Sequence, residues 1–214
     1  MALSTSPVSS RPEAADPFDQ EALARFYRWQ AHVYDWTRPL ILFGRRQLLD
    51  SLDVAAGARV LDVGCGTGWS FGPLAARGAR IVGVECSPAM RRRAEARRRA
   101  RRLEGSVRLD PRPYGSHDGY LASVDHMVFS YSLSMMPPYE EILSRAVQDL
   151  APWGSIGVVD FLDAPGPVAA WLSRCHVSLG PQRLRVLSRL FPVHDLQVRS
   201  AGLWRYFLFR GDAP

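Results

Sequence analysis

The sequence predicts an α/β protein with a seven-stranded, mostly parallel sheet covered by helices on both faces. Apolar, strand-like runs alternate with stretches of helical periodicity between residues 58 and 190. The first run leads into VLDVGCGTG at residues 60–68, a strand followed by a glycine-rich turn. The last two strand-like runs follow each other without a helix, which predicts an antiparallel edge. Together these patterns are typical of a doubly wound, Rossmann-like fold.

The segment before the sheet divides into two parts. Residues 1–16 are rich in Ser, Ala and Pro and are expected to form a disordered tail. Residues 17–55 form the expected N-terminal helical cap, with apolar residues at helical spacing over 18–39 and a second helical stretch after Pro39. Residues 56–214 are expected to form the Rossmann-like domain.

The elements of that domain follow from the apolar pattern. Strands are expected at residues 58–64, 79–85, 106–110, 124–134, 154–161, 195–200 and 203–211. Helices are expected at residues 69–78, 87–102, 138–151, 168–179 and 182–190. Ser87 is a favourable N-cap for the second of these helices, and Gly78 ends the first.

Composition limits the classes of function. The chain has 214 residues, 47% of them hydrophobic and 22% charged, which is typical of a soluble globular domain. No apolar run reaches the roughly 18–20 residues that span a bilayer, and no secretory signal is evident, so a cytoplasmic protein is expected. The three cysteines show no paired spacing, so neither a disulfide framework nor a metal site is expected.

All 27 basic residues are arginine, and eight of them lie in RRRAEARRRARR at residues 91–102. This run is interpreted first as a solvated helix face. Two alternatives are a peripheral contact with an anionic membrane surface and the binding of nucleic acid, of which nucleic acid is the less favoured.

The glycine-rich turn does not fit the two common phosphate-binding patterns. Gly64, Gly66 and Gly68 are spaced GxGxG, whereas the dinucleotide fingerprint is GxGxxG, and no GKS or GKT follows. Glu85 ends the second strand, seventeen residues after Gly68, where a carboxylate can accept hydrogen bonds from two adjacent hydroxyls.

VLDVGCGTG resembles the first motif of the class I S-adenosylmethionine-dependent methyltransferases. The resemblance implies that S-adenosylmethionine is the cofactor and that Glu85 binds its ribose hydroxyls. The family's adenine-binding aspartate after the third strand has no clear equivalent: Asp110 is one alternative, and packing by Pro113 and Tyr114 is the other. The cofactor-binding residues expected in and near the motif are Asp62, Gly64, Cys65, Gly66, Gly68, Glu85, Cys86 and Ser130.

The segment SYSLSMMPPYEEIL after the fourth strand offers neutral hydroxyls at Ser130, Tyr131, Ser132 and Ser134. It lacks the Asn/Asp-Pro-Pro-Tyr/Phe signature of amide-nitrogen methyltransferases and an Asp–His pair for magnesium. Such hydroxyls suit the binding of an amine better than the generation of a strong base.

Several segments together are similar to the N-methyltransferases of betaine-lipid synthesis: FYRWQAHVYDWTRPLILFGRRQLL, the glycine loop, FSYSLSMMPPYEEIL, VVDF and WLSRCHV. This resemblance implies an acceptor amine on a small or lipid-linked amino acid. It implies that Tyr34 and Arg45 hold the amino-acid end of the cofactor, and that Tyr131, Ser132 and His176 face the acceptor as catalytic residues. His176 fits equally well as a core histidine.

Aromatic side chains in the first helix could also contact a sulfonium or ammonium cation. Tyr27 and Trp29 are assigned to the substrate on this basis, together with Ser134. Ordinary amphipathic packing is the alternative for these aromatic residues.

Two other functions remain open from the sequence. The cofactor's own amine could displace methylthioadenosine and close a four-membered ring, as in azetidine-2-carboxylate synthases, which also look like methyltransferases. A methyltransferase relative, or a non-catalytic binder, could instead bind nucleic acid through the arginine run.

Overall fold

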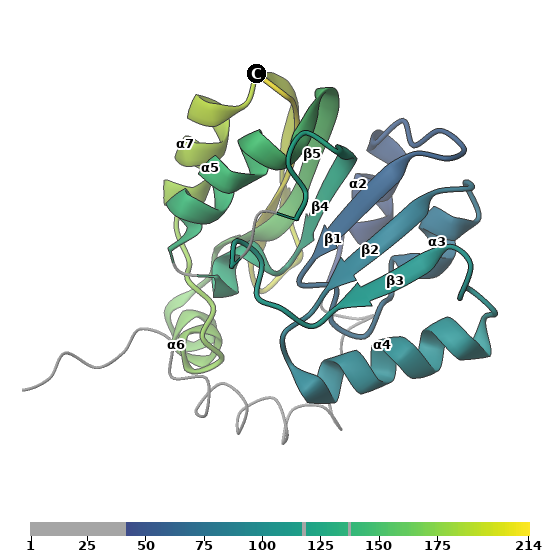
Figure 1. The fold of residues 1–214 in the computed structure, drawn as a ribbon. Helices are drawn as coiled ribbons and strands as arrows, with labels where there is room; N and C mark the ends of the chain where they lie inside the picture. Colours follow the sequence, from purple (N-terminus) through teal and green to yellow (C-terminus); the bar gives the residue numbers. More distant parts are fainter. Residues whose placement is uncertain (1–41, 117–118, 137) are drawn as a thin grey trace, which may run out of the picture.

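The computed structural model describes residues 42–116, 119–136 and 138–214. They form one seven-stranded sheet with helices on both faces (Figure 1). The strands are β1 (Arg59–Val63), β2 (Arg80–Val84), β3 (Val107–Asp110), β4 (Val124–Ser130), β5 (Leu150–Asp163), β6 (Val193–Ser200) and β7 (Arg205–Asp212). The helices are α2 (Arg45–Ser51), α3 (Phe71–Ala75), α4 (Pro88–Ala100), the 3-10 helix η2 (Leu133–Met135), α5 (Tyr139–Asp149), α6 (Gly166–Arg174) and α7 (Gln182–Leu190).

The strand order is β3-β2-β1-β4-β5-β7-β6. β1 to β5 are parallel, and β7 lies antiparallel between β5 and β6. The expected Rossmann-like sheet with an antiparallel hairpin at one edge is therefore confirmed. Val63 is in register with Val84 of β2 and with Phe129 of β4, so the carboxyl ends of these three central strands meet at one edge.

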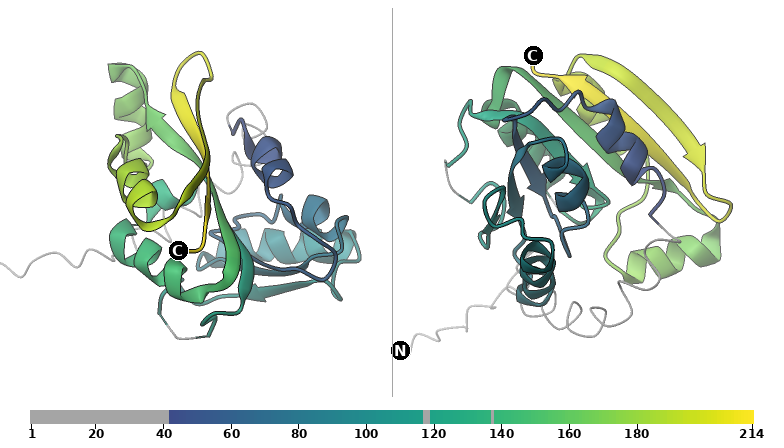
Figure 2. Two further views of the ribbon diagram at one scale, coloured as in Figure 1. Left: turned by 90° about the horizontal axis from the view of Figure 1, so that it is seen from above. Right: turned by 90° about the vertical axis from the view of Figure 1, so that its right-hand side faces the viewer.

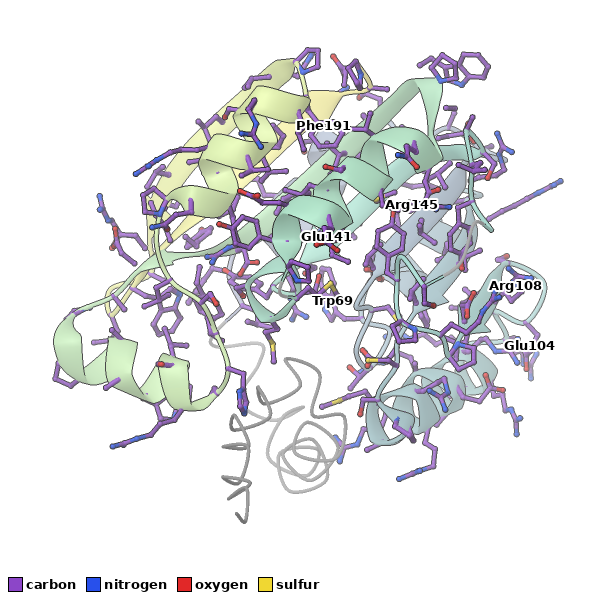
Figure 3. All side chains as sticks on the ribbon, turned by 60° about the vertical axis from the view of Figure 1, so that its left-hand side comes forward. Trp69, Glu104, Arg108, Glu141, Arg145 and Phe191 are labelled. Carbon is purple, nitrogen blue, oxygen red and sulfur yellow. The ribbon has the colours of Figure 1, made fainter. Side chains whose placement is uncertain are left out.

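Each face of the sheet has its own hydrophobic core. α2, α3 and α4 cover one face, and α5 and α7 cover the other (Figure 2). Figure 3 shows the second face, with Glu141 and Arg145 on α5 and Phe191 directly after α7. The alternation of side chains along each strand supplies both cores: Val60 of β1 belongs to the first, and Leu61 belongs to the second.

Several element boundaries differ from the expected ones, and three of these differences have a local cause. β4 ends at Ser130 rather than at residue 134, because Tyr131 adopts a left-handed conformation (φ 56°) that turns the chain into η2. β5 starts at Leu150, which pairs with Val124 across an irregularity in the β4–β5 ladder. α6 ends at Arg174, just before His176, which also has a left-handed φ of 57°.

The N-terminal assignments fall mainly on residues 1–41, outside the described residues. α2 packs on the sheet itself: Leu48 and Leu52 lie against Gly157 of β5, where an added Cβ would be 3.0 Å from Leu48 Cδ1. Among the described residues, no helix is both long enough and apolar enough to cross a membrane.

Candidate functional site

The glycine loop after β1 is tied to the end of β2. The N–H groups of Gly64 and Cys65 both donate to the carbonyl of Val84, at 2.9 and 3.0 Å. Gly64, Gly66 and Gly68 have φ values of 70°, 58° and 73°, a conformation in which a residue with a Cβ is strained. The backbone conformation is therefore sufficient by itself to require glycine at these three positions.

The chain's own packing also excludes a side chain at Gly64. A Cβ there would lie 2.6 Å from Ser132 Cβ and 2.8 Å from Met136 Cε. The motif's first glycine thus lets the segment after β4 approach the loop after β1. These two segments line one cavity from opposite sides.

Glu85 follows β2 directly and is 8% exposed. Its Oε2 accepts a hydrogen bond from the Gly66 N–H at 3.0 Å, and its Oε1 accepts one from the Ser87 N–H at 2.8 Å. Ser87 is the N-cap of α4, with its hydroxyl accepting from the Met90 N–H. One carboxylate therefore joins the glycine loop to the start of α4.

Asp62 is buried at the end of β1, and its charge is only partly compensated. The Ser70 hydroxyl donates to Oδ2, whereas Oδ1 has no hydrogen-bond partner among the described residues. Burial raises the pKa of Asp62 to about 6; the nearby charge of Glu85 acts in the same direction, and Ser70 and Arg45 oppose it. A cation bound beside Oδ1 would satisfy this carboxylate.

Arg45 begins α2 and is 9% exposed, with its guanidinium carbon 4.3 Å from the ring centroid of Trp69. Its positive charge lowers the pKa of both Asp62 and Tyr131 against the stronger effect of burial. Arg45 thus acts electrostatically on residues from both walls of the site.

The cavity at this edge of the sheet combines the two segments with the start of α4 and the loop after β3. Its lining residues are Gly64, Gly66, Val84, Glu85, Cys86, Met90, Pro113, Tyr114, Ser130, Tyr131, Ser132, Met135 and Met136. The thiol of Cys86 has a raised pKa, chiefly because of burial and then because of Glu85, so it stays protonated at neutral pH. Cys65, whose pKa burial also raises, is likewise a neutral thiol.

Asp110 does not line this cavity, and its carboxylate is occupied. The Arg112 guanidinium donates to both oxygens, at 3.0 and 2.8 Å, and the Tyr120 hydroxyl donates to Oδ2 at 2.6 Å. The Arg112 hydrogen bonds and that of Tyr120 hold the pKa of Asp110 well below its usual range. Pro113 and Tyr114, the other alternative for adenine, do line the cavity, and the adenine contact stays a prediction.

The segment after β4 is fixed by its own polar groups. The Tyr131 hydroxyl donates to the Phe43 carbonyl at 2.9 Å, and burial raises the pKa of this tyrosine far above its ordinary value. The Ser132 hydroxyl donates to the Val63 carbonyl at 2.6 Å, and the Ser134 N–H donates to Asp160 Oδ2 at 2.6 Å. None of these side chains is arranged to act as a base.

Comparisons with known proteins agree with this geometry. A methyltransferase-domain family model matches residues 60–154. The chain is 33% identical over 205 residues to a trans-aconitate 2-methyltransferase of Methylobacterium nodulans, covering 83% of this chain and 71% of that protein. The chain belongs to the class I S-adenosylmethionine-dependent methyltransferases.

Two further similarities show the range of the family. The methyltransferase GfsG of Streptomyces halstedii is 31% identical over 166 residues, covering 70% of this chain and 58% of that one. The chain spans little more than half the length of the first curated relatives it matches. The solved 1,6-didemethyltoxoflavin-N1-methyltransferase of Burkholderia thailandensis, with bound S-adenosylhomocysteine, shares the fold at a TM-score of 0.71 and 20% identity, covering 97% and 93% of the two chains.

The residues of this methyltransferase fit its cofactor, S-adenosylmethionine, which when bound supplies an activated methyl group. Asp62 Oδ1 is a buried acceptor that can receive the donor groups of the cofactor's ammonium. Glu85, at the tip of β2, would accept the ribose hydroxyls, and its Oε2 already accepts the Gly66 N–H of the glycine loop.

Sequence reasoning missed two buried charged residues, Asp160 and Arg183, behind the segment after β4. Asp160 of β5 is fully buried; besides Ser134, it accepts the Phe161 N–H at 2.8 Å. Arg183 of α7 is 2% exposed and donates to the Phe161 carbonyl at 2.7 Å. Burial raises the pKa of Asp160, and the positive charge of Arg183 opposes that rise. The available signal was an aspartate in the apolar run GSIGVVDF and an arginine on the apolar face of the helix at 182–190.

The remaining assigned residues are not brought into this cavity by the described structure. His176 lies on the surface just after α6, and its N–H donates to the Ser173 carbonyl at 3.0 Å. Tyr27, Trp29 and Tyr34 lie outside the described residues. The catalytic, substrate and cofactor roles given to these four residues stay predictions.

Proposed function

We propose that this methyltransferase methylates the neutral amine of a small or lipid-linked amino acid. The observation that carries the proposal is the lack of an available base among the described lining residues of the cavity. Glu85 is the one carboxylate there, and its two oxygens already hold the N–H groups of Gly66 and Ser87. The Tyr131 hydroxyl donates a hydrogen bond to the Phe43 backbone carbonyl, and its pKa is raised.

An acceptor for such a site must be nucleophilic without losing a proton to a base of the enzyme. An α-amino group has a pKa of about 8, so a useful fraction is neutral near physiological pH without help from the enzyme. What the protein supplies is position and exclusion of water, by a wall of hydroxyl and thioether side chains at Ser130, Met135 and Met136.

A carboxylate acceptor is the second candidate, because the relative from Methylobacterium nodulans is named for methylation of trans-aconitate. A carboxylate, too, is nucleophilic without a base. The two acceptors differ in pH dependence: an amine reacts faster as pH rises toward its pKa, whereas a carboxylate is fully ionised above about pH 6.

Product analysis tests the proposal directly. The full chain is incubated with S-adenosylmethionine alone, with homoserine, with vesicles containing diacylglyceryl-homoserine, and with trans-aconitate, and the products are identified by mass spectrometry. S-adenosylhomocysteine formed only with an amine supports the proposal, and a rate that rises between pH 6 and 9 strengthens it. S-adenosylhomocysteine formed with trans-aconitate would show that the acceptor is a carboxylate and not an amine. Methylthioadenosine formed without an acceptor would instead support cyclisation to azetidine-2-carboxylate.

A lipid-linked acceptor would also give the arginine run a use. On α4, several guanidinium groups serve the protein itself: Arg91 donates to the carbonyls of Glu85 and Cys86, and Arg98 pairs with Glu95. Arg92 and Arg102 are exposed and remain available to an anionic surface. Flotation with phosphatidylglycerol vesicles, compared with phosphatidylcholine vesicles, tests this contact. Binding that does not fall with added salt would exclude an electrostatic role for these arginines.

A further inference from the structure

β6 is the last strand of the sheet that the described residues form, and none of their strands pairs with its outer edge. β7 is its one neighbour, and no other strand of the described residues pairs with β6. Figure 2 (right) shows this strand outermost, beyond β7 and β5. It is eight residues long and contains no proline, one of the residue types with which natural proteins protect an exposed edge.

Leu196 and Val198 are exposed apolar side chains on one face of β6, which they share with His194 and Ser200. Leu196 and Val198 are 41% and 46% exposed and pair with Phe209 and Phe207 of β7, on the face covered by α7. Val193, at the start of the strand, is 48% exposed. An edge strand with such a row of side chains is a surface for pairing with another strand.

The opposite face of β6 carries an ordered row of polar residues. The Gln197 Nε2 donates to Asp195 Oδ2 at 2.7 Å, and the Arg199 guanidinium donates to Gln197 Oε1 at 2.8 Å. A negative and a positive side chain therefore stand two residues to either side of one glutamine. A strand with opposite charges placed symmetrically about a centre is complementary to itself when it is reversed.

We propose that β6 pairs antiparallel with β6 of a second copy of this chain, about a two-fold axis at Gln197. In this register Asp195 of each copy lies opposite Arg199 of the other, and Leu196 lies opposite Val198. Directly opposed side chains of an antiparallel pair have Cβ atoms about 4.5–5.5 Å apart, close enough for both contacts. The interface is isologous, and the two sheets become one.

The neighbouring registers lack this match. Directly opposite residues of an antiparallel pair either both direct their backbone groups at the partner strand or both direct them away, so the two-fold axis can move along β6 only in steps of one whole residue. Centred on Leu196, the pairing would place Val198 opposite His194; centred on Val198, it would place Leu196 opposite Ser200. Those axes place one apolar residue opposite its own copy, whereas only the axis at Gln197 pairs both Leu196 and Val198 with apolar partners and also sets acid against base.

The dimer is expected to be reversible and independent of the cofactor site. Exposed ion pairs contribute little, and a pair of eight-residue strands buries less than the roughly 1,200–2,000 Å² of a stable interface. β6 is separated from β1 by β4, β5 and β7, so pairing at this edge leaves the cavity open. Failure of this proposal would therefore say nothing about the proposed methyl transfer, and the reverse also holds.

Sedimentation velocity of the full chain over about 5–300 µM tests the pairing by charge exchange. The wild type is expected to shift from monomer to dimer with concentration. D195R and R199D each place like charges opposite each other, so the dissociation constant should rise by at least about tenfold. The double variant D195R/R199D restores opposite charges and should restore dimerisation.

A second pair of variants tests the apolar face. V198K should abolish dimerisation, whereas L121K, at a leucine that is 55% exposed in the loop before β4, should leave it unchanged. Each variant's fold is checked by circular dichroism and by binding of S-adenosylmethionine. A wild type that stays monomeric throughout, single exchanges without effect, or a double exchange that fails to restore the dimer would each overturn the proposal.

Discussion

The backbone N–H of Gly66 donates a hydrogen bond to Glu85 Oε2 at 3.0 Å, so the carboxylate at the tip of β2 holds the glycine loop of β1. Its other oxygen holds the Ser87 N–H at the start of α4. The residue expected to bind the cofactor's ribose thus also shapes the loop that receives the rest of the cofactor.

Replacing Glu85 by alanine should weaken binding of S-adenosylmethionine by about ten- to a hundredfold, since each hydrogen bond to a charged group contributes about 1.5–3 kcal/mol. Isothermal titration calorimetry measures the change. Glu104→Ala is the control, because Glu104 is exposed just before β3, away from the carboxyl edge of the sheet. Binding by Glu85→Ala within twofold of the wild type would remove Glu85 from the cofactor site.

Replacing Asp62 by asparagine should stabilise the cofactor-free protein at pH 8 but not at pH 4. The pKa of Asp62 is about 6 in the folded chain against an ordinary 3.8, so the ionised form is disfavoured by folding. Its contribution to stability is complete below about pH 4 and is lost as pH rises through 6, by up to about 3 kcal/mol. Urea unfolding at several pH values measures this difference.

Asp163→Asn is the matched control, because a hydrogen bond from Arg205 lowers the pKa of this exposed aspartate. Asp163→Asn should therefore slightly destabilise the protein at high pH, whereas Asp62→Asn should stabilise it there. Equal effects of the two substitutions at every pH would contradict the assignment of a raised pKa to Asp62.

Gly64→Ala should impair both folding and activity, whereas Gly57→Ala should impair stability only slightly. Both glycines have a left-handed φ, 70° and 83°, so both substitutions strain the backbone by about 1–2 kcal/mol. Only the Cβ at 64 also strikes Ser132 and Met136, which adds about 1–3 kcal/mol of overpacking. Unfolding free energies and turnover of S-adenosylmethionine compare the two variants. Similar losses in both variants would mean that the segment around η2 moves away from the added Cβ at little cost in free energy.

Arg183→Met should destabilise the protein by about 1–3 kcal/mol, because the buried Phe161 carbonyl would lose its hydrogen-bond donor and Asp160 would lose the nearby positive charge that favours its ionised form. Arg185→Met, on an exposed position of the same helix, should change stability by no more than about 0.5 kcal/mol. Chemical denaturation tests both. If Arg183→Met were as stable as Arg185→Met, neither the hydrogen bond to Phe161 nor the charge of Arg183 would stabilise the fold.

The sequence predicted the parts of this molecule that depend on local pattern. Apolar runs located all seven strands, and the spacing of Gly64, Gly66 and Gly68 located the loop and its family. It did not predict contacts between distant segments. Asp160 and Arg183 belong to different elements with separate patterns, and the reason for glycine at 64 includes a serine 68 positions later, which no local signal reveals.

Boundaries failed where a single residue turned the chain. The left-handed Tyr131 ends β4 early, since an apolar and aromatic run has no local feature that distinguishes a strand from a turn at that point. The expected occupation of the adenine site by Asp110 remained open for a similar reason: its ion pair with Arg112 forms only in the folded loop.

The Ser132 hydroxyl joins the two walls of the cavity by donating to the carbonyl of Val63, and the Ser134 N–H ties the segment after β4 to Asp160 of β5. Met135 and Met136 directly follow these serines in the sequence, and their flexible thioethers line the cavity. A change of acceptor preference, whether by natural divergence or in the laboratory, should therefore be tolerated first at these two methionines. Substitutions at Ser132 or Ser134 would instead disturb the binding sites of both the methyl donor and the acceptor.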